Sequence, residues 1–140
     1  MSISQALLPE FDQEMATTRK LLERVPSDKG AWKPHPKSFA LGHLAQSPQY
    51  TLETTDALLD RFDGCVGEAR EALKHTKDSD FIVPWSLKHG DRVLFTAPRG
   101  VVVRQHINHL VHHRGQLSVY LRLNDIPVPA LYGPSADEQN

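Results

Sequence analysis

Apolar residues recur at the three-to-four-residue spacing of an amphipathic helix in four stretches of the chain. These stretches are residues 3–25, 38–47, 54–73 and 101–124. Each is long enough to bury one face against its neighbours, except that the second would measure only about 15 Å at the helical rise per residue. A helix of that length cannot cover the apolar stripes of neighbours about twice as long.

Particular residues mark where these helices begin and end. Pro26 ends the first, and Pro48 stops the second. Ser38 is the expected N-cap of the second helix, and either Thr51 or Thr54 that of the third. The fourth begins after Pro98 and Gly100, and a proline-rich tail follows it.

The pattern changes between Phe81 and Phe95, where two short apolar runs flank the turn-forming residues 88–91. Two short strands are expected there. The fold prediction is therefore an all-α, antiparallel four-helix bundle of one domain, residues 1–140, with a short β-hairpin or extended segment between helices three and four.

Composition excludes several function classes. The formal net charge is −1, with 24% charged residues, and no basic patch supports nucleic-acid binding. No apolar run reaches the ~20 residues of a membrane helix, and no secretory signal begins the chain, so a cytoplasmic location without membrane contact is expected. The single cysteine, Cys65, rules out an internal disulfide and is expected to be a small core residue.

Four of the eight histidines fall in one helical stretch, at His106, His109, His112 and His113. His109 and His113 stand four residues apart and project from the same side on successive turns. Two imidazoles at that spacing can bind one metal ion, as in HExxH helices. No Glu occupies the position of the catalytic base in HExxH, so a zinc-protease reading is excluded.

A second reading of these histidines stays open. A lone histidine on an apolar face is usually a core residue bonded to a carbonyl or carboxylate. The spacing places His106, His109 and His113 on the interior face and His112 elsewhere, and His106 could substitute for one of the pair. Only His43 offers an imidazole from another helix. The remaining histidines are expected in solvated loops or at element ends: His35, His75 and His89.

Several motifs now resemble those of one family. They are WKP at residues 32–34, SFALGHLA at 38–45, NHLVHHRGQL at 108–117 and YGPSA at 132–136. The chain resembles the DinB-like proteins, the damage-inducible four-helix family, over nearly its whole length. The resemblance implies an up-down-down-up bundle, frequent homodimers, and three histidines on a divalent metal, most often nickel or zinc.

By this resemblance, His109 and His113 match the two metal ligands of the family's fourth helix. The family's third metal ligand has no direct match. The family's helix-two histidine stands five positions after the glycine matched by Gly42, and that position is Ser47. His43, one turn earlier, is the possible stand-in. We therefore expect a segment between Gln46 and Gln49 to be missing relative to the family.

Two functions remain open from the sequence. The first is a metal-dependent hydrolase or thiol S-transferase, with His43, His109 and His113 as ligands and a small-molecule or thiol substrate in stress response or detoxification. The second is a bundle without catalysis that dimerises or binds a ligand, having lost its third metal ligand. Gln116 is expected to orient a ligand or a histidine, Arg114 to pair with an acid on a neighbouring helix, and Tyr120 to be a core aromatic. No catalytic nucleophile or base can be named.

Overall fold

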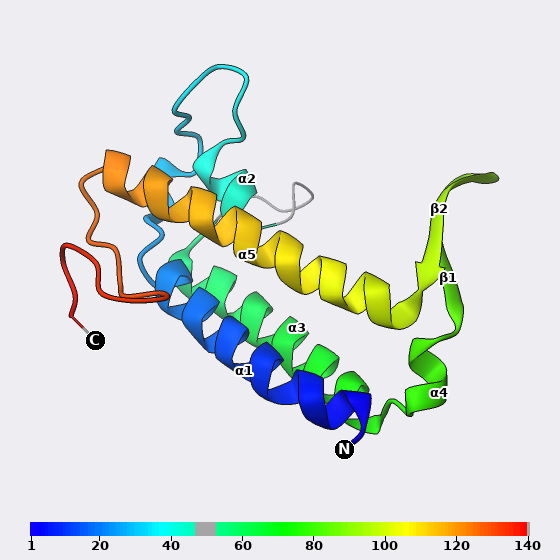
Figure 1. The fold of residues 1–140 in the computed structure, drawn as a ribbon. Coiled ribbons are helices and arrows are strands. Elements are labelled where there is room, and N and C mark those ends of the chain that lie inside the picture. The colour runs from blue at the N-terminus through cyan, green and yellow to red at the C-terminus, as the bar shows by residue number, and fades with distance from the viewer. Residues whose placement is uncertain (47–52, 140) are drawn as a thin grey trace.

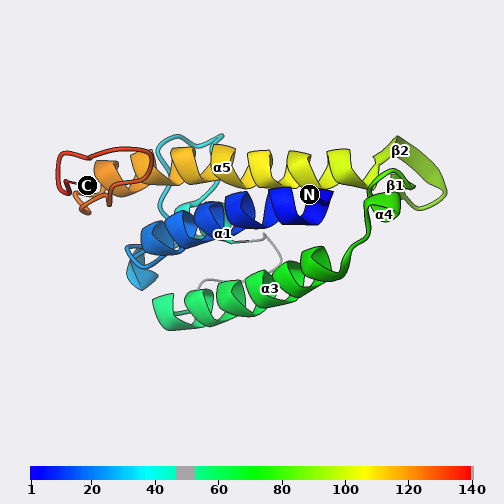
Figure 2. The same ribbon diagram turned by 60° about the horizontal axis from the view of Figure 1, so that its bottom comes forward.

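The computed structural model describes residues 1–46 and 53–139, and these are mostly helical (Figure 1). Three long helices form the body: α1 (Ile3–Leu22), α3 (Thr55–His75) and α5 (Arg99–Leu123). Helix α1 packs against both α3 and α5 and lies between them in Figure 2. The mainly helical fold that the sequence predicts is confirmed. None of the helices described is long and apolar enough to cross a membrane.

The helix starts follow the expected capping chemistry in two cases. Ser2 and Gln5 form a reciprocal capping box at the start of α1. Thr54 caps α3, its hydroxyl accepting a hydrogen bond from the Ala57 amide at 3.0 Å. Of the two threonines expected to cap this helix, Thr54 is therefore correct.

Helix α2 (Leu41–Ala45) is a single turn preceded by the short 3₁₀ helix η1 (Ser27–Lys29). The prediction that Ser38 caps a helix starting there is wrong, because the helix begins only after Ala40. Carbonyls of the preceding connector take the place of a capping side chain: the Leu41 amide donates to Trp32 O and the Gly42 amide to Gly30 O, both at 2.9 Å. The end of the predicted helix at Ser47 and the expected missing segment lie outside the described residues.

Two antiparallel strands, β1 (Pro84–His89) and β2 (Arg92–Pro98), occupy the stretch where two strands were expected. Gly90 has a φ of 58° in the connecting turn, a conformation that suits glycine. The strands follow the one-turn helix α4 (Asp78–Phe81) and project from the helical body at the start of α5 (Figure 1).

The core consists of two apolar clusters along α1. One packs the C-terminal halves of α1 and α5 with α2, around Leu21, Leu41 and Leu121. The other packs the N-terminal half of α1 with Leu73, Phe81 and Ile107.

Helix α3 is poorly covered. Of its predicted apolar stripe, only Leu58 and Leu73 are buried, whereas Phe62 and Val66 are half-buried and Ala69 is exposed. The physical reason is the length of α2, which in the described residues is one turn.

The prediction of a core Cys65 is also wrong. Its side chain is exposed. It lies on the part of α3 that α2 does not reach, where the chain leaves an open groove instead of a packed interior.

Candidate metal centre

His109 and His113 converge as their spacing predicts. Their Nε2 atoms lie 2.9 Å apart, and their rings meet edge to face with centroids 4.3 Å apart. The central geometric expectation, two imidazoles on successive turns aimed at one point, is therefore met by the folded chain. Without a third atom between them, one ring nitrogen donates a hydrogen bond to the other.

Gln116 determines which nitrogen carries the proton. Its Oε1 lies 2.8 Å from His113 Nδ1, and an amide oxygen can only accept. His113 Nδ1 therefore carries the proton, which leaves the Nε2 lone pair of His113 facing His109. This is the arrangement that second-shell partners impose on metal-binding histidines.

The donor separation fits a shared cation. Two imidazole nitrogens bound to one ion at about 2.1 Å lie about 3.0 Å apart at a right angle between the bonds and about 3.4 Å apart at the tetrahedral angle. The observed 2.9 Å between the Nε2 atoms is close to the first value and about 0.5 Å short of the second, and both rings must turn so that their nitrogens point at the ion instead of at each other. The pair thus suits a divalent metal of the borderline class that imidazole prefers.

The surroundings of His109 favour its neutral form. Burial lowers the pKa of His109, and repulsion from His113, His106 and His112 lowers it further. A neutral imidazole is the form that binds a metal, so the lowered pKa favours the charge state of His109 from which a metal can be bound at neutral pH.

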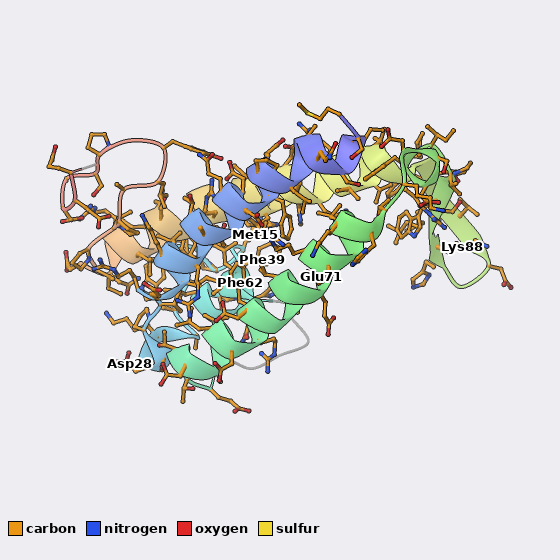
Figure 3. All side chains as sticks on the ribbon, turned by 90° about the horizontal axis from the view of Figure 1, so that it is seen from below. Met15, Asp28, Phe39, Phe62, Glu71 and Lys88 are labelled. Carbon is orange, nitrogen blue, oxygen red and sulfur yellow. The ribbon has the colours of Figure 1, made fainter. Side chains whose placement is uncertain are left out.

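The two imidazoles line a pocket of about 450 Å³ together with His43, Phe39 and Phe62. We call this the histidine pocket. The Phe39 ring lies against His43, with centroids 4.4 Å apart, and 6.4 Å from the His113 ring. Figure 3 shows Phe39 and Phe62 close together between the helices. The pocket therefore has basic nitrogen donors on an aromatic wall.

Tyr120 helps to position Phe39 in the wall of the histidine pocket. Its hydroxyl donates to Phe39 O at 3.1 Å, and its ring meets Trp32 edge to face at 5.5 Å. The expectation of a core aromatic with its hydroxyl at the edge agrees with this placement.

His43 shares the pocket but does not complete a three-donor set. Across residues 1–46 and 53–139, no three His, Cys, Asp or Glu side chains are grouped closely enough to hold one metal ion. The structure brings together His109 and His113 from the predicted triad and places His43 on the opposite wall, beside Phe39.

The other histidines take the more ordinary roles. His106 was expected on the interior face, but its side chain is exposed and its Nδ1 lies 2.8 Å from Val102 O, so it does not substitute for a ligand. His112 is exposed, as expected of a residue on a different face. His35 lies in the connector and His75 ends α3, as predicted, whereas His89, expected in the turn, is the last residue of β1.

Sequence reasoning missed Glu14 beneath the site. Arg114 is almost fully buried and its Nη2 lies 2.6 Å from Glu14 Oε2, although its N–H groups are not aligned for a hydrogen bond there. Arg114 Nη1 donates instead to Glu14 O and Thr18 Oγ1, and the Tyr132 hydroxyl donates to the Glu14 carboxylate at 2.8 Å. The expected pairing of Arg114 with an acid on a neighbouring helix is confirmed. Nothing in the spacing of α1 points to Glu14 as that acid.

Comparison with known proteins identifies the family to which the motifs around the histidine pair belong. The profile of the DinB family matches residues 43–140, which is more than half of the chain. The chain belongs to the DinB family. No curated protein matches it.

A crystal structure of a DinB-like protein from Bacillus cereus ATCC 10987 has the same fold. It aligns with a TM-score of 0.77 over 94% of this chain and 98% of the other, at 21% identity. At that identity the likeness supports the fold alone. The chemistry of this DinB chain has to be argued from its own residues.

Proposed function

We propose that this DinB protein binds one divalent metal ion, nickel or zinc, through His109 and His113. The observation that carries the proposal is the 2.9 Å separation of their Nε2 atoms, which suits a shared ion as well as a hydrogen bond. His43, on the facing wall of the histidine pocket, is the third ligand we propose, after a change of its side-chain rotamer away from Phe39.

The chain's own groups prepare the site. Gln116 holds His113 with Nε2 unprotonated, and the lowered pKa of His109 keeps that ring neutral. Only a shift of the His109 proton from Nε2 to Nδ1 is then needed to expose the second lone pair. Phe39 and Phe62 supply the aromatic part of the pocket's lining.

A divalent ion held by three imidazoles supplies Lewis acidity, which lowers the pKa of a bound water towards ~7 or keeps a thiol as its thiolate. The first property suits a hydrolase and the second a thiol S-transferase acting on a small molecule. We propose an enzyme of one of these two types, in stress response or detoxification.

Calorimetric titration of tag-free protein with Zn²⁺ or Ni²⁺ tests the proposal. We expect one ion per chain, and a loss of affinity of more than about 100-fold in His113→Ala, since loss of even an outer-shell partner costs about 10–100-fold. His112→Ala is the matched control, because it removes the exposed neighbouring imidazole and leaves the pair intact. Substoichiometric binding that His113→Ala leaves unchanged would contradict the proposal.

One observation favours a second candidate, a helical module without metal. This is the absence of a three-donor group among the residues that the structure describes. His43→Ala separates the two functions. If the protein is a metal enzyme, His43→Ala binds the metal ion more weakly than wild type, as His113→Ala does. If it is a module without metal, neither variant shows specific metal binding.

A further inference from the structure

An apolar groove runs between α3 and α5 next to the histidine pocket. It has a volume of about 660 Å³, and its walls include Phe62, Val66 and Ala69 from α3 and Val103 and Leu110 from α5. Leu73 and Phe81 close one end, where α3 leads into α4. We call this the α3–α5 groove. It is the space that the single turn of α2 leaves beside α3.

The groove adjoins the histidine pocket. Phe62 and Leu110 line both spaces, and Leu110 directly follows His109 in α5. From Val102 to Leu110 the groove follows about 12 Å of the helix axis. A molecule lying in the groove therefore has one end next to the histidine pocket.

Polar groups gather at the ends of this path. Thr76, Asp80 and Arg99 lie at the α4 end, and His109 and His113 at the other. Between them the walls are mostly aliphatic and aromatic. A volume of this size falls within the range of about 300–1,000 Å³ typical of small-molecule pockets, which are mainly apolar with a few polar groups for orientation.

We propose that the α3–α5 groove binds the apolar chain of the substrate, an elongated molecule whose polar, reacting end lies at His109 and His113. The proposal rests on the proposed function for the identity of the reacting end. The binding of the chain itself depends only on the groove. Burial of apolar carbon supplies the affinity, and each methylene removed from water is expected to tighten binding about fourfold.

Cys65 offers a reporter for the test. It is the only cysteine in the sequence, it is exposed, and it lies in the wall of the groove. A chain bound there covers the thiol. The rate at which metal-free protein reacts with Ellman's reagent therefore measures occupancy of the groove without any contribution from a metal.

The probe is decanoate below its micellar concentration, with butyrate as the short-chain control. We expect the Cys65 reaction to be about tenfold slower at a decanoate concentration about ten times its Kd, and unchanged by butyrate. Ala69→Trp fills the groove and is expected to weaken decanoate binding at least about tenfold, measured by calorimetry. Ala16→Trp, on the exposed face of α1, is the matched control and keeps the wild-type affinity.

The inference would be overturned if the Cys65 thiol reacted equally fast with and without decanoate, or if butyrate slowed the reaction as much as decanoate does. It would also be overturned if the reaction slowed with rising protein concentration alone, because a dimer would then already cover the thiol. That result would assign the groove to a second copy of the chain. Failure of the proposed function looks different, because decanoate would still protect Cys65 while His113→Ala left metal binding unchanged. Intact metal binding with an unprotected Cys65 would remove only this inference.

Discussion

Gln116 orients the histidine pair by its hydrogen bond with His113. Its Oε1 accepts from His113 Nδ1 at 2.8 Å, so Gln116→Leu removes the group that fixes the His113 tautomer. We expect this variant to bind Zn²⁺ about 10–100-fold more weakly in competition with a fluorescent chelator. Gln116→Glu keeps an acceptor at the same place and is expected to retain tight binding. Equal affinities for Gln116→Leu and wild type would show that the contact does not position the ligand.

The lowered pKa of His109 makes stability depend on pH. Below the unfolded-state value of about 6.5, the unfolded chain takes up a proton that the folded His109 resists. The free energy of unfolding therefore falls as the pH decreases through this range towards the lower, folded-state pKa. In urea denaturation of metal-free protein between about pH 7.5 and pH 5.5, wild type should lose more stability than His109→Gln. Parallel pH profiles for the two proteins would contradict this.

The buried ion pair of Arg114 with Glu14 links α5 to α1. The side chains of Arg114 and Glu14 are 2% and 12% exposed, so Arg114→Met leaves a buried carboxylate without its cation. We expect a destabilisation of about 3–5 kcal/mol in chemical denaturation, largely recovered in the double variant with Glu14→Leu.

The exposed pair Arg104–Glu10 joins the same two helices and is the matched control. Arg104→Met should cost less than about 1 kcal/mol. Equal costs for the two arginine variants would mean that burial of the Arg114–Glu14 pair contributes nothing.

Helix α3 buries fewer of its residues than either of the other long helices, α1 and α5. Gly67 lies in its exposed part, and a Cβ added there meets no described atom within 4 Å. Gly67→Ala should therefore raise the free energy of unfolding by about 0.5–1 kcal/mol through helix propensity. Gly100→Ala in α5 is the control, since its Cβ would lie 3.3 Å from Phe81 Cβ and the gain should disappear. Loss of stability in Gly67→Ala would mean that α3 is covered at this point.

The elements that the sequence predicted are those whose signals are local. The periodicity of apolar residues, together with the capping residues, predicted α1, α3, α5 and the two strands. The i, i+4 spacing predicted that His109 and His113 lie together. The start of α2 could not be found in the same way. It depends on hydrogen bonds from Leu41 and Gly42 to Trp32 and Gly30, which become neighbours only after the connector folds back.

At the scale of the whole molecule, packing decides what local patterns cannot. Cys65 has the sequence surroundings of a core residue and becomes exposed because α2 does not reach it. Glu14 and Arg114 are 100 positions apart, and only the contact of α1 with α5 makes them a pair. Homodimerisation, implied by the family resemblance, stays a prediction. The apolar side chains of Ile82, Val93 and Leu94, in and beside the strands, are exposed.

The most direct test of the account is anomalous diffraction from crystals of the tag-free protein soaked in Zn²⁺ and measured across the zinc absorption edge. The account predicts one strong peak per chain, about 2.1 Å from both His109 Nε2 and His113 Nε2. A peak only at a surface histidine such as His75, with the two Nε2 atoms still hydrogen-bonded to each other, would contradict it.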